Sequence, residues 1–268
     1  MGEVLETARS WLFVPGDRPD RFAKAAASGA DVVICDLEDA VAPEAKAAAR
    51  SAVADWLGAG GQAVVRVNAG STPWFDDDVA ALAGAPGLLG VMLPKAEDPA
   101  AVAGAAARAQ APVVALVESA LGVLRASDIA AAAARIAFGS LDFALDIDAD
   151  HDDDAALLLA RGTLVLAARA AGRPAPIDGV TTALDDPQAA ARDAARARRL
   201  GFAGKLCIHP RQIEPIHRAF APTDEQIEWA QQIIAAYGDG TAGAVRSSRG
   251  ELIDAPVLRR AQTILEGR

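Results

Sequence analysis

Residues 113–142 read VVALVESALGVLRASDIAAAAARIAFGSLD. The stretch opens with an apolar run at 113–117 and closes with another at 135–138, and an alanine-rich segment of helical period at 121–133 separates them. Continuous apolar runs joined by a helix are typical of parallel strands that are covered on both faces. Polar residues follow each run, with Glu118 after the first and Asp142 after the second. The stretch therefore predicts one strand–helix–strand unit with carboxylates at the strand ends.

The same pattern repeats along the whole chain. Eight apolar runs lie at 11–14, 32–35, 63–67, 90–93, 113–117, 135–138, 176–177 and 205–208. Seven helical segments are expected at 18–28, 44–57, 76–83, 99–108, 121–133, 154–171 and 187–200. Eight such units predict a (β/α)₈ TIM barrel, which needs about 250 residues, with a doubly wound open sheet as the alternative. We expect the barrel to span residues 1–238 and a short C-terminal segment to span 239–268.

Composition excludes several classes of protein. The chain has 268 residues, of which 52% are hydrophobic, and a formal net charge of −10. A chain with this many hydrophobic residues can bury a large core, so global disorder is not expected. A chain with this negative charge repels the phosphates of nucleic acid. No apolar run is long enough to span a membrane. The N-terminal residues include Glu3 and Glu6 and lack the apolar core of a signal peptide. Two cysteines, Cys35 and Cys207, fit buried thiols of a cytoplasmic protein rather than a disulfide framework.

The strongest candidates for chemistry follow the strands, where the active sites of such barrels lie. Glu118 and Asp142 follow adjacent strands, so their carboxylates can converge on a hard cation such as Mg²⁺. The alternative is an ion pair of Glu118 with an arginine and a helix cap at Asp142. Arg66, at the end of another run, could bind a substrate carboxylate or stabilise an enolate oxygen. The alternative is a salt bridge to Asp36 or Glu38, and the two roles are compatible.

Other polar residues support weaker hypotheses. Arg18, Arg21 and Lys24 share one expected helix and could bind a phosphate-rich ligand, or form only a solvated face. His209 follows the last strand and could be a general base or a hydrogen-bonded structural residue. The acidic run at 148–154 is expected to be a solvated loop that leads into a helix.

Eight short motifs, in order along nearly the whole chain, resemble the citrate-lyase-β-like (CitE-like) branch of the HpcH/HpaI aldolase family. They are LFVPGDR at 12–18, DLEDAV at 36–41, RVN at 66–68, MLPK at 92–95, VES at 117–119, FGSLD at 138–142, CIHP at 207–210 and IDAP at 253–256. The resemblance implies a (β/α)₈ barrel that makes or breaks a carbon–carbon bond between a 2-oxo acid and an acyl-CoA. Where many members have an acidic residue before the metal-binding aspartate, this chain has Leu141.

The resemblance also implies roles for single residues. Glu118 and Asp142 would hold Mg²⁺, and Arg66 would bind the oxo acid. Phe13, Arg18, Lys24, Ile208 and His209 would line the substrate or coenzyme A site. Asp254 would act as acid/base from a C-terminal segment that packs on a neighbouring subunit, commonly of a homotrimer.

Four functions are therefore weighed. The first is a Mg²⁺-dependent lyase that cleaves a β-hydroxyacyl-CoA, such as citramalyl-CoA or malyl-CoA, into a 2-oxo acid and an acyl-CoA. The second is the β subunit of a citrate lyase complex, which acts on a citryl thioester. The others are a non-catalytic homologue that binds 2-oxo acids and an aldolase that acts on substrates without coenzyme A.

Overall fold

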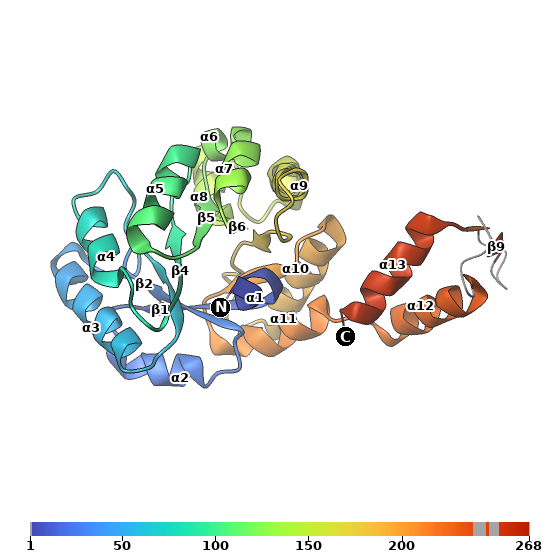
Figure 1. Cartoon of the computed structure of the whole chain (residues 1–268), viewed down its shortest axis with the longest axis horizontal. Coiled ribbons are helices and arrows are strands. Elements are labelled where there is room, and N and C mark those ends of the chain that lie inside the picture. Colours follow the sequence, from blue (N-terminus) through green and yellow to red (C-terminus); the bar gives the residue numbers. More distant parts are fainter. Residues whose placement is uncertain (1, 238–244, 247–251, 268) are drawn as a thin grey trace. The chain divides into compact units, whose positions relative to one another are not determined.

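The computed structural model describes residues 2–237, 245–246 and 252–267 (Figure 1). The chain divides into two compact units, residues 1–217 and 218–268. The first is a barrel and the second a helical unit, so the division falls earlier in the chain than the expected boundary between 238 and 239. The reason is that α12 (Asp224–Tyr237) packs against α13 (Ala255–Glu266) around a small core of their own. This core consists of Ala230, Ile233, Ile253 and Ala261.

Eight parallel strands form the closed barrel, in the order in which they occur in the chain. They are β1 (Ser10–Pro15), β2 (Val32–Asp36), β3 (Ala63–Arg66), β4 (Leu88–Leu93), β5 (Val113–Val117), β6 (Arg135–Phe138), β7 (Ile177–Asp178) and β8 (Gly204–Cys207). β1 pairs with β8 through Trp11 and Leu206, which closes the barrel and excludes the open sheet. The expected (β/α)₈ TIM barrel is therefore confirmed.

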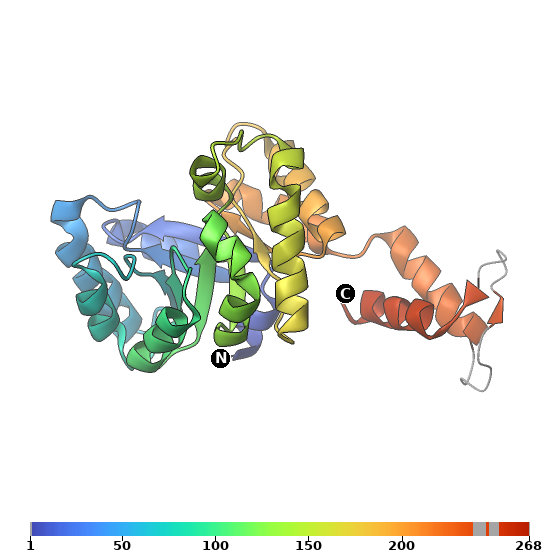
Figure 2. The ribbon, with the colours of Figure 1, turned by 90° about the horizontal axis from the view of Figure 1, so that it is seen from above.

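Helices surround the strands (Figures 1 and 2). In the barrel unit these are α1 (Gly2–Thr7), η1 (Pro19–Arg21), α2 (Phe22–Ala26), η2 (Pro43–Ala45), α3 (Lys46–Gly58), α4 (Phe75–Leu82), α5 (Pro99–Ala109), α6 (Ala120–Leu124), α7 (Ala126–Ala132), α8 (Ser140–Asp146), α9 (Asp154–Ala170), α10 (Pro187–Leu200) and η3 (Pro210–Gln212). α11 (Ile213–Phe220) follows, and β9 (Val245–Arg246) pairs with β10 (Leu252–Ile253) in the second unit. None of the helices that the structure describes is both long and apolar enough to cross a membrane.

Two expected helices differ in detail. The segment 18–28 begins as the short 3₁₀ turn η1, and Arg18 precedes it instead of lying on a helix. Pro19 explains this, because a proline disfavours helical backbone at the residue before it. The segment 121–133 is split into α6 and α7 at Arg125, whose ψ of 9° departs from the α-helical value.

Apolar side chains fill the interior of the barrel. Trp11, Met92 and Leu206 belong to the apolar cluster inside it. The fully buried Arg135 donates hydrogen bonds to the carbonyl oxygens of Leu5 and Ala8, and so ties the α1 region to β6. The interior of the barrel is therefore packed with side chains.

Candidate active site

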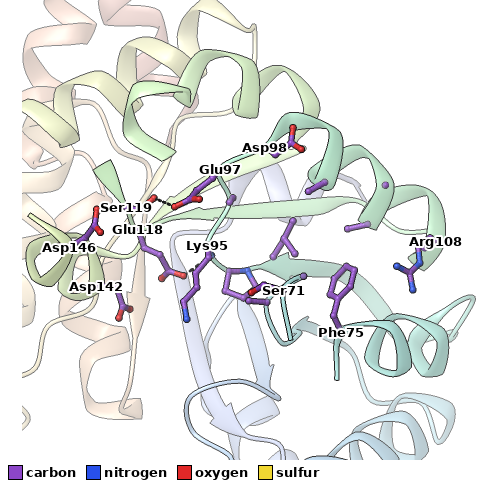
Figure 3. Close-up of a pocket in the computed structure, with 18 of the residues that line it drawn as sticks. Ser71, Phe75, Lys95, Glu97, Asp98, Arg108, Glu118, Ser119, Asp142 and Asp146 are labelled. Atoms are coloured by element: carbon purple, nitrogen blue, oxygen red, sulfur yellow. Dashed lines mark hydrogen bonds between the residues drawn. The ribbon is translucent and has the colours of Figure 1, made fainter. Parts of the chain in front are cut away.

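Two cavities that meet at the same carboxylates open at the carboxyl ends of the strands. The smaller, of about 350 Å³, is lined from β1, β2, β3, β5, β6, β7 and β8 or the loops that follow them. The larger, of about 830 Å³, extends over the loops after β3 and β4 and along α5 (Figure 3). Glu118 and Asp142 line both cavities. The pair that the sequence singled out as metal ligands therefore lies where the two cavities meet.

Glu118 follows β5 directly, and its side chain is buried. Its Oε1 accepts a hydrogen bond from the backbone N–H of Lys95 at 2.7 Å. Burial raises the pKa of Glu118 to about 8, and the negative charge of Glu38 adds to the rise. Within the described ranges Glu118 forms no ion pair with an arginine, so that alternative is not observed. A buried carboxylate without a cationic partner is suited to a bound cation.

Asp142 lies in the first turn of α8, and its side chain is exposed. α8 starts immediately after β6, with Gly139 as its N-cap. The cap at this helix is thus Gly139 and not Asp142. Figure 3 shows the Asp142 carboxylate beside Glu118 at one end of the larger cavity.

Gly139 allows this close approach, because a Cβ atom there would lie 2.5 Å from both Cβ and Oε2 of Glu118. We therefore expect Gly139→Ala to displace the Glu118 carboxylate and to weaken Mg²⁺ binding by about tenfold or more, the loss of one charged contact. Gly104→Ala is the matched control, since nothing lies within 4 Å of its added Cβ. Titration calorimetry with Mg²⁺ measures both variants, and equal affinities would contradict the expectation.

Arg66 ends β3 and is enclosed by carboxylates. Its Nε and Nη2 donate to Asp36 at 2.7 and 2.6 Å, and its Nη1 lies 3.2 Å from Glu38 and 3.3 Å from Asp39. The guanidinium also lies 4.9 Å from the ring centroid of Phe13. The salt bridge that the sequence left as an alternative is therefore formed, to Asp36 and to Glu38.

Glu38 is the residue of this site that the sequence undervalued. It is 6% exposed, and burial raises its pKa to about 7. Its Oε2 lies near Arg66 but forms no hydrogen bond, and its Oε1 lies 3.7 Å from Nζ of Lys95. The DLEDAV motif signals an acidic strand end, but nothing in it shows which carboxylate is buried.

Of the other residues predicted to line the substrate or coenzyme A site, only some lie at the two cavities. Phe13 and Ile208 line the smaller cavity. Arg18 and Lys24 line neither cavity, and Arg18 is held by Asp20 through contacts of 2.9 and 2.8 Å. Nδ1 of His209 accepts the N–H of Arg211 and caps η3, which is the structural alternative.

Asp254 lies in the second unit, where its Oδ1 accepts the N–H of Val257 and caps α13. Asp150, His151 and Asp152 form an exposed group whose ligand atoms lie within 4.8 Å of one another, as expected of a solvated acidic loop. In the described part of the chain it is the only set of three such residues. Glu118 and Asp142 are a pair, which suits Mg²⁺ because this ion keeps several waters.

Comparisons with known proteins agree with this architecture. The HpcH/HpaI aldolase/citrate lyase family matches residues 9–210. A citrate lyase subunit beta-like protein of Mycobacterium tuberculosis is 42% identical over 265 residues, covering 95% of this chain and 93% of that protein. A (3S)-malyl-CoA thioesterase of Cereibacter sphaeroides is 37% identical over 247 residues, covering 88% of this chain and 85% of that protein.

A solved structure is also similar over the whole chain. It is that of protein CitE from Mycobacterium tuberculosis in complex with magnesium, acetoacetate and coenzyme A, with a TM-score of 0.85, 39% identity and 97% of each chain covered. Likeness of this extent covers both the barrel and the C-terminal segment. The chain therefore belongs to the HpcH/HpaI aldolase/citrate lyase family.

Proposed function

We propose that the protein is a Mg²⁺-dependent carbon–carbon lyase that cleaves a β-hydroxyacyl-CoA into a 2-oxo acid and an acyl-CoA. The observation that carries the proposal is the Glu118–Asp142 pair at the junction of two cavities. Two cavities suit a reaction with two products. Relatives that are named for citrate lyase and malyl-CoA chemistry support the same substrate class.

The residues at the junction fit a magnesium ion. Glu118 is buried without a cationic partner in the described residues, Asp142 offers an exposed carboxylate, and Glu38 has an oxygen without a hydrogen bond. We infer that Glu118 and Asp142 would hold the ion. When bound, Mg²⁺ would supply positive charge to the hydroxyl and carboxylate oxygens of the substrate.

The chain's own residues perform the rest of the proposed reaction. Glu38, with a pKa of about 7, can take up the hydroxyl proton as the carbon–carbon bond breaks. The electron pair of that bond moves to the acyl-CoA as an enolate, and the oxo acid leaves. Asp254 is our candidate for the acid that protonates the enolate, from a C-terminal segment that belongs to a neighbouring copy in a homotrimer.

Phe13 and Ile208 line the smaller cavity and are assigned to the substrate. His209 is assigned a supporting role, because its ring nitrogen already caps η3. Arg18 and Lys24 stay assigned to coenzyme A by resemblance alone, and the ion pair of Arg18 with Asp20 weakens that assignment.

The direct test is an assay of the purified protein with Mg²⁺ against malyl-, methylmalyl-, citramalyl- and hydroxymethylglutaryl-CoA. We expect release of an oxo acid together with an acyl-CoA from at least one ester. Free CoA from an intact hydroxy acid would indicate a thioesterase instead. No turnover by the pure chain, with turnover restored by citrate lyase partner subunits, would indicate the β subunit of a complex. Binding of pyruvate or oxaloacetate without any turnover would indicate the non-catalytic homologue.

Mg²⁺ affinity is expected to depend on pH in a defined direction. Without metal the pKa of Glu118 is about 8, so at neutral pH the ion must displace its proton. Affinity should rise by about tenfold per pH unit below the pKa and level off above it. Calorimetry in buffers of different ionisation enthalpy at pH 7 should show about one proton released per ion. An affinity that is constant between about pH 6 and 8 would contradict the protonated state of Glu118.

A further inference from the structure

Few positive charges are available to an anionic substrate at this site. In the described part of the chain, the cationic side chains that line the two cavities are Arg66, Lys95 and Arg108. Arg66 is occupied by three carboxylates, from Asp36, Glu38 and Asp39. Arg108 pairs with Asp76 at 2.8 Å and lies over the Phe75 ring. Of the three, Lys95 has the weakest pairing, because its Nζ lies 3.7 Å from Oε1 of Glu38.

The backbone of Lys95 is unusual for a lysine. Its φ is +49°, in the left-handed region that favours glycine. The other two non-glycine residues described with positive φ, Gln110 and Asp148, follow helix ends, where this conformation is common. Lys95 instead follows β4, where its N–H is directed at Glu118. A glycine would adopt this turn with less strain, so the lysine side chain itself needs an explanation.

The position of the side chain supplies one. Lys95 is 57% exposed and lies in the larger cavity at the end that holds Glu118 and Asp142, whereas Arg108 and Phe75 lie at the far end (Figure 3). The Mg²⁺ that Glu118 and Asp142 would hold supplies part of the positive charge that a substrate carboxylate needs at this end, and the Lys95 ammonium can supply more. The flexible stem of lysine lets the ammonium move from Glu38 to such a group.

We propose that Lys95 binds the carboxylate of the 2-oxo acid at the Glu118–Asp142 pair. The inference rests on the proposed function and adds a substrate-binding residue to it. The ammonium is held by Glu38 in the free protein and transfers this contact to the substrate. The left-handed turn serves both contacts, because it directs the backbone N–H at Glu118 and leaves the side chain at the metal end of the cavity.

Titration calorimetry of Lys95→Met with Mg²⁺ alone, and then with Mg²⁺ plus pyruvate or oxaloacetate, tests the proposal. The oxo acid should bind about 10- to 100-fold more weakly, the loss expected for one charge-assisted hydrogen bond. Mg²⁺ alone should bind as well as before or more tightly, because a positive charge beside its ligands is gone. Arg108→Met removes a positive charge from the far end of the same cavity and should leave oxo-acid affinity unchanged.

A second pair of variants separates the amine from the backbone. Lys95→Gly and Gln110→Gly both relieve a left-handed residue, so each should raise Tm by about 2–4 °C. Only Lys95→Gly should lose oxo-acid affinity, and added methylammonium should restore part of it. Equal weakening of Mg²⁺ and oxo acid in both Lys95 variants, or unchanged oxo-acid binding, would overturn the proposal. Wild-type protein that binds no oxo acid with Mg²⁺ would instead overturn the proposed function.

Discussion

Glu118→Gln is expected to abolish measurable Mg²⁺ binding and to lower lyase turnover by at least about 10³-fold, because the ion contributes several kcal/mol to the reaction. The substitution keeps the size of the side chain and can still accept the N–H of Lys95. Burial makes it costly to ionise the Glu118 carboxyl, and glutamine carries no such charge. Without metal, the variant should therefore be more stable than the wild type at a pH above the Glu118 pKa of about 8. The folded state holds that proton more tightly than the unfolded chain, so the wild type loses this stability as pH rises.

Calorimetry with Mg²⁺, the lyase assay and urea denaturation at two pH values measure the three effects. Glu97→Gln is the control, because Glu97 lines the same cavity and is engaged by the Ser119 hydroxyl at 2.5 Å. This variant should keep Mg²⁺ binding. Full Mg²⁺-dependent turnover in Glu118→Gln would show that the metal lies elsewhere. If Glu118→Gln failed to fold, urea denaturation would show no cooperative unfolding transition, which separates misfolding from loss of the metal site.

The barrel could be predicted from sequence because its signals are local. Each strand is a short apolar run, and even the two-residue β7 was marked by Ile177 between helical segments. The two units could be predicted less well, because no domain-scale shift in composition marks where the second unit begins. The assignment of α12 to the C-terminal unit depends on pairing with α13, which no neighbouring residue indicates.

At the site, too, some features follow from a residue's own segment of sequence and others depend on contacts with neighbouring strands. Arg66, Glu118 and Asp142 could be identified because each ends an apolar run or follows one closely. The burial of Glu38 could not, since it depends on Arg66 from β3 and Lys95 after β4. The left-handed turn of Lys95 likewise comes with a hydrogen bond from its N–H to Glu118, which follows β5. Short motifs therefore locate the residues of this site, while their charge states depend on neighbouring strands.

Arg66→Met is expected to destabilise the fold by about 3–5 kcal/mol, because it leaves buried carboxylates without their cation. Asp36 and Glu38 are 1% and 6% exposed, and both contact the guanidinium. Urea denaturation at neutral pH measures the loss. Arg108→Met removes a solvent-exposed ion pair with Asp76 and should cost less than about 1 kcal/mol. A similar small effect in Arg66→Met would mean that solvent reaches these carboxylates.

The pH dependence of this destabilisation identifies its cause. Burial raises the pKa of Glu38 and Arg66 lowers it, so without Arg66 the pKa should rise above the present value of about 7. The carboxyl is then neutral over a wider pH range, so the stability difference between variant and wild type should shrink as pH falls toward about 7 and stay constant below it. Asp36→Asn in the Arg66→Met background should recover part of the loss at neutral pH, because it removes one stranded charge. If Asp36→Asn recovers no stability and the destabilisation by Arg66→Met is the same at every pH, the effect comes from lost packing on Phe13 instead.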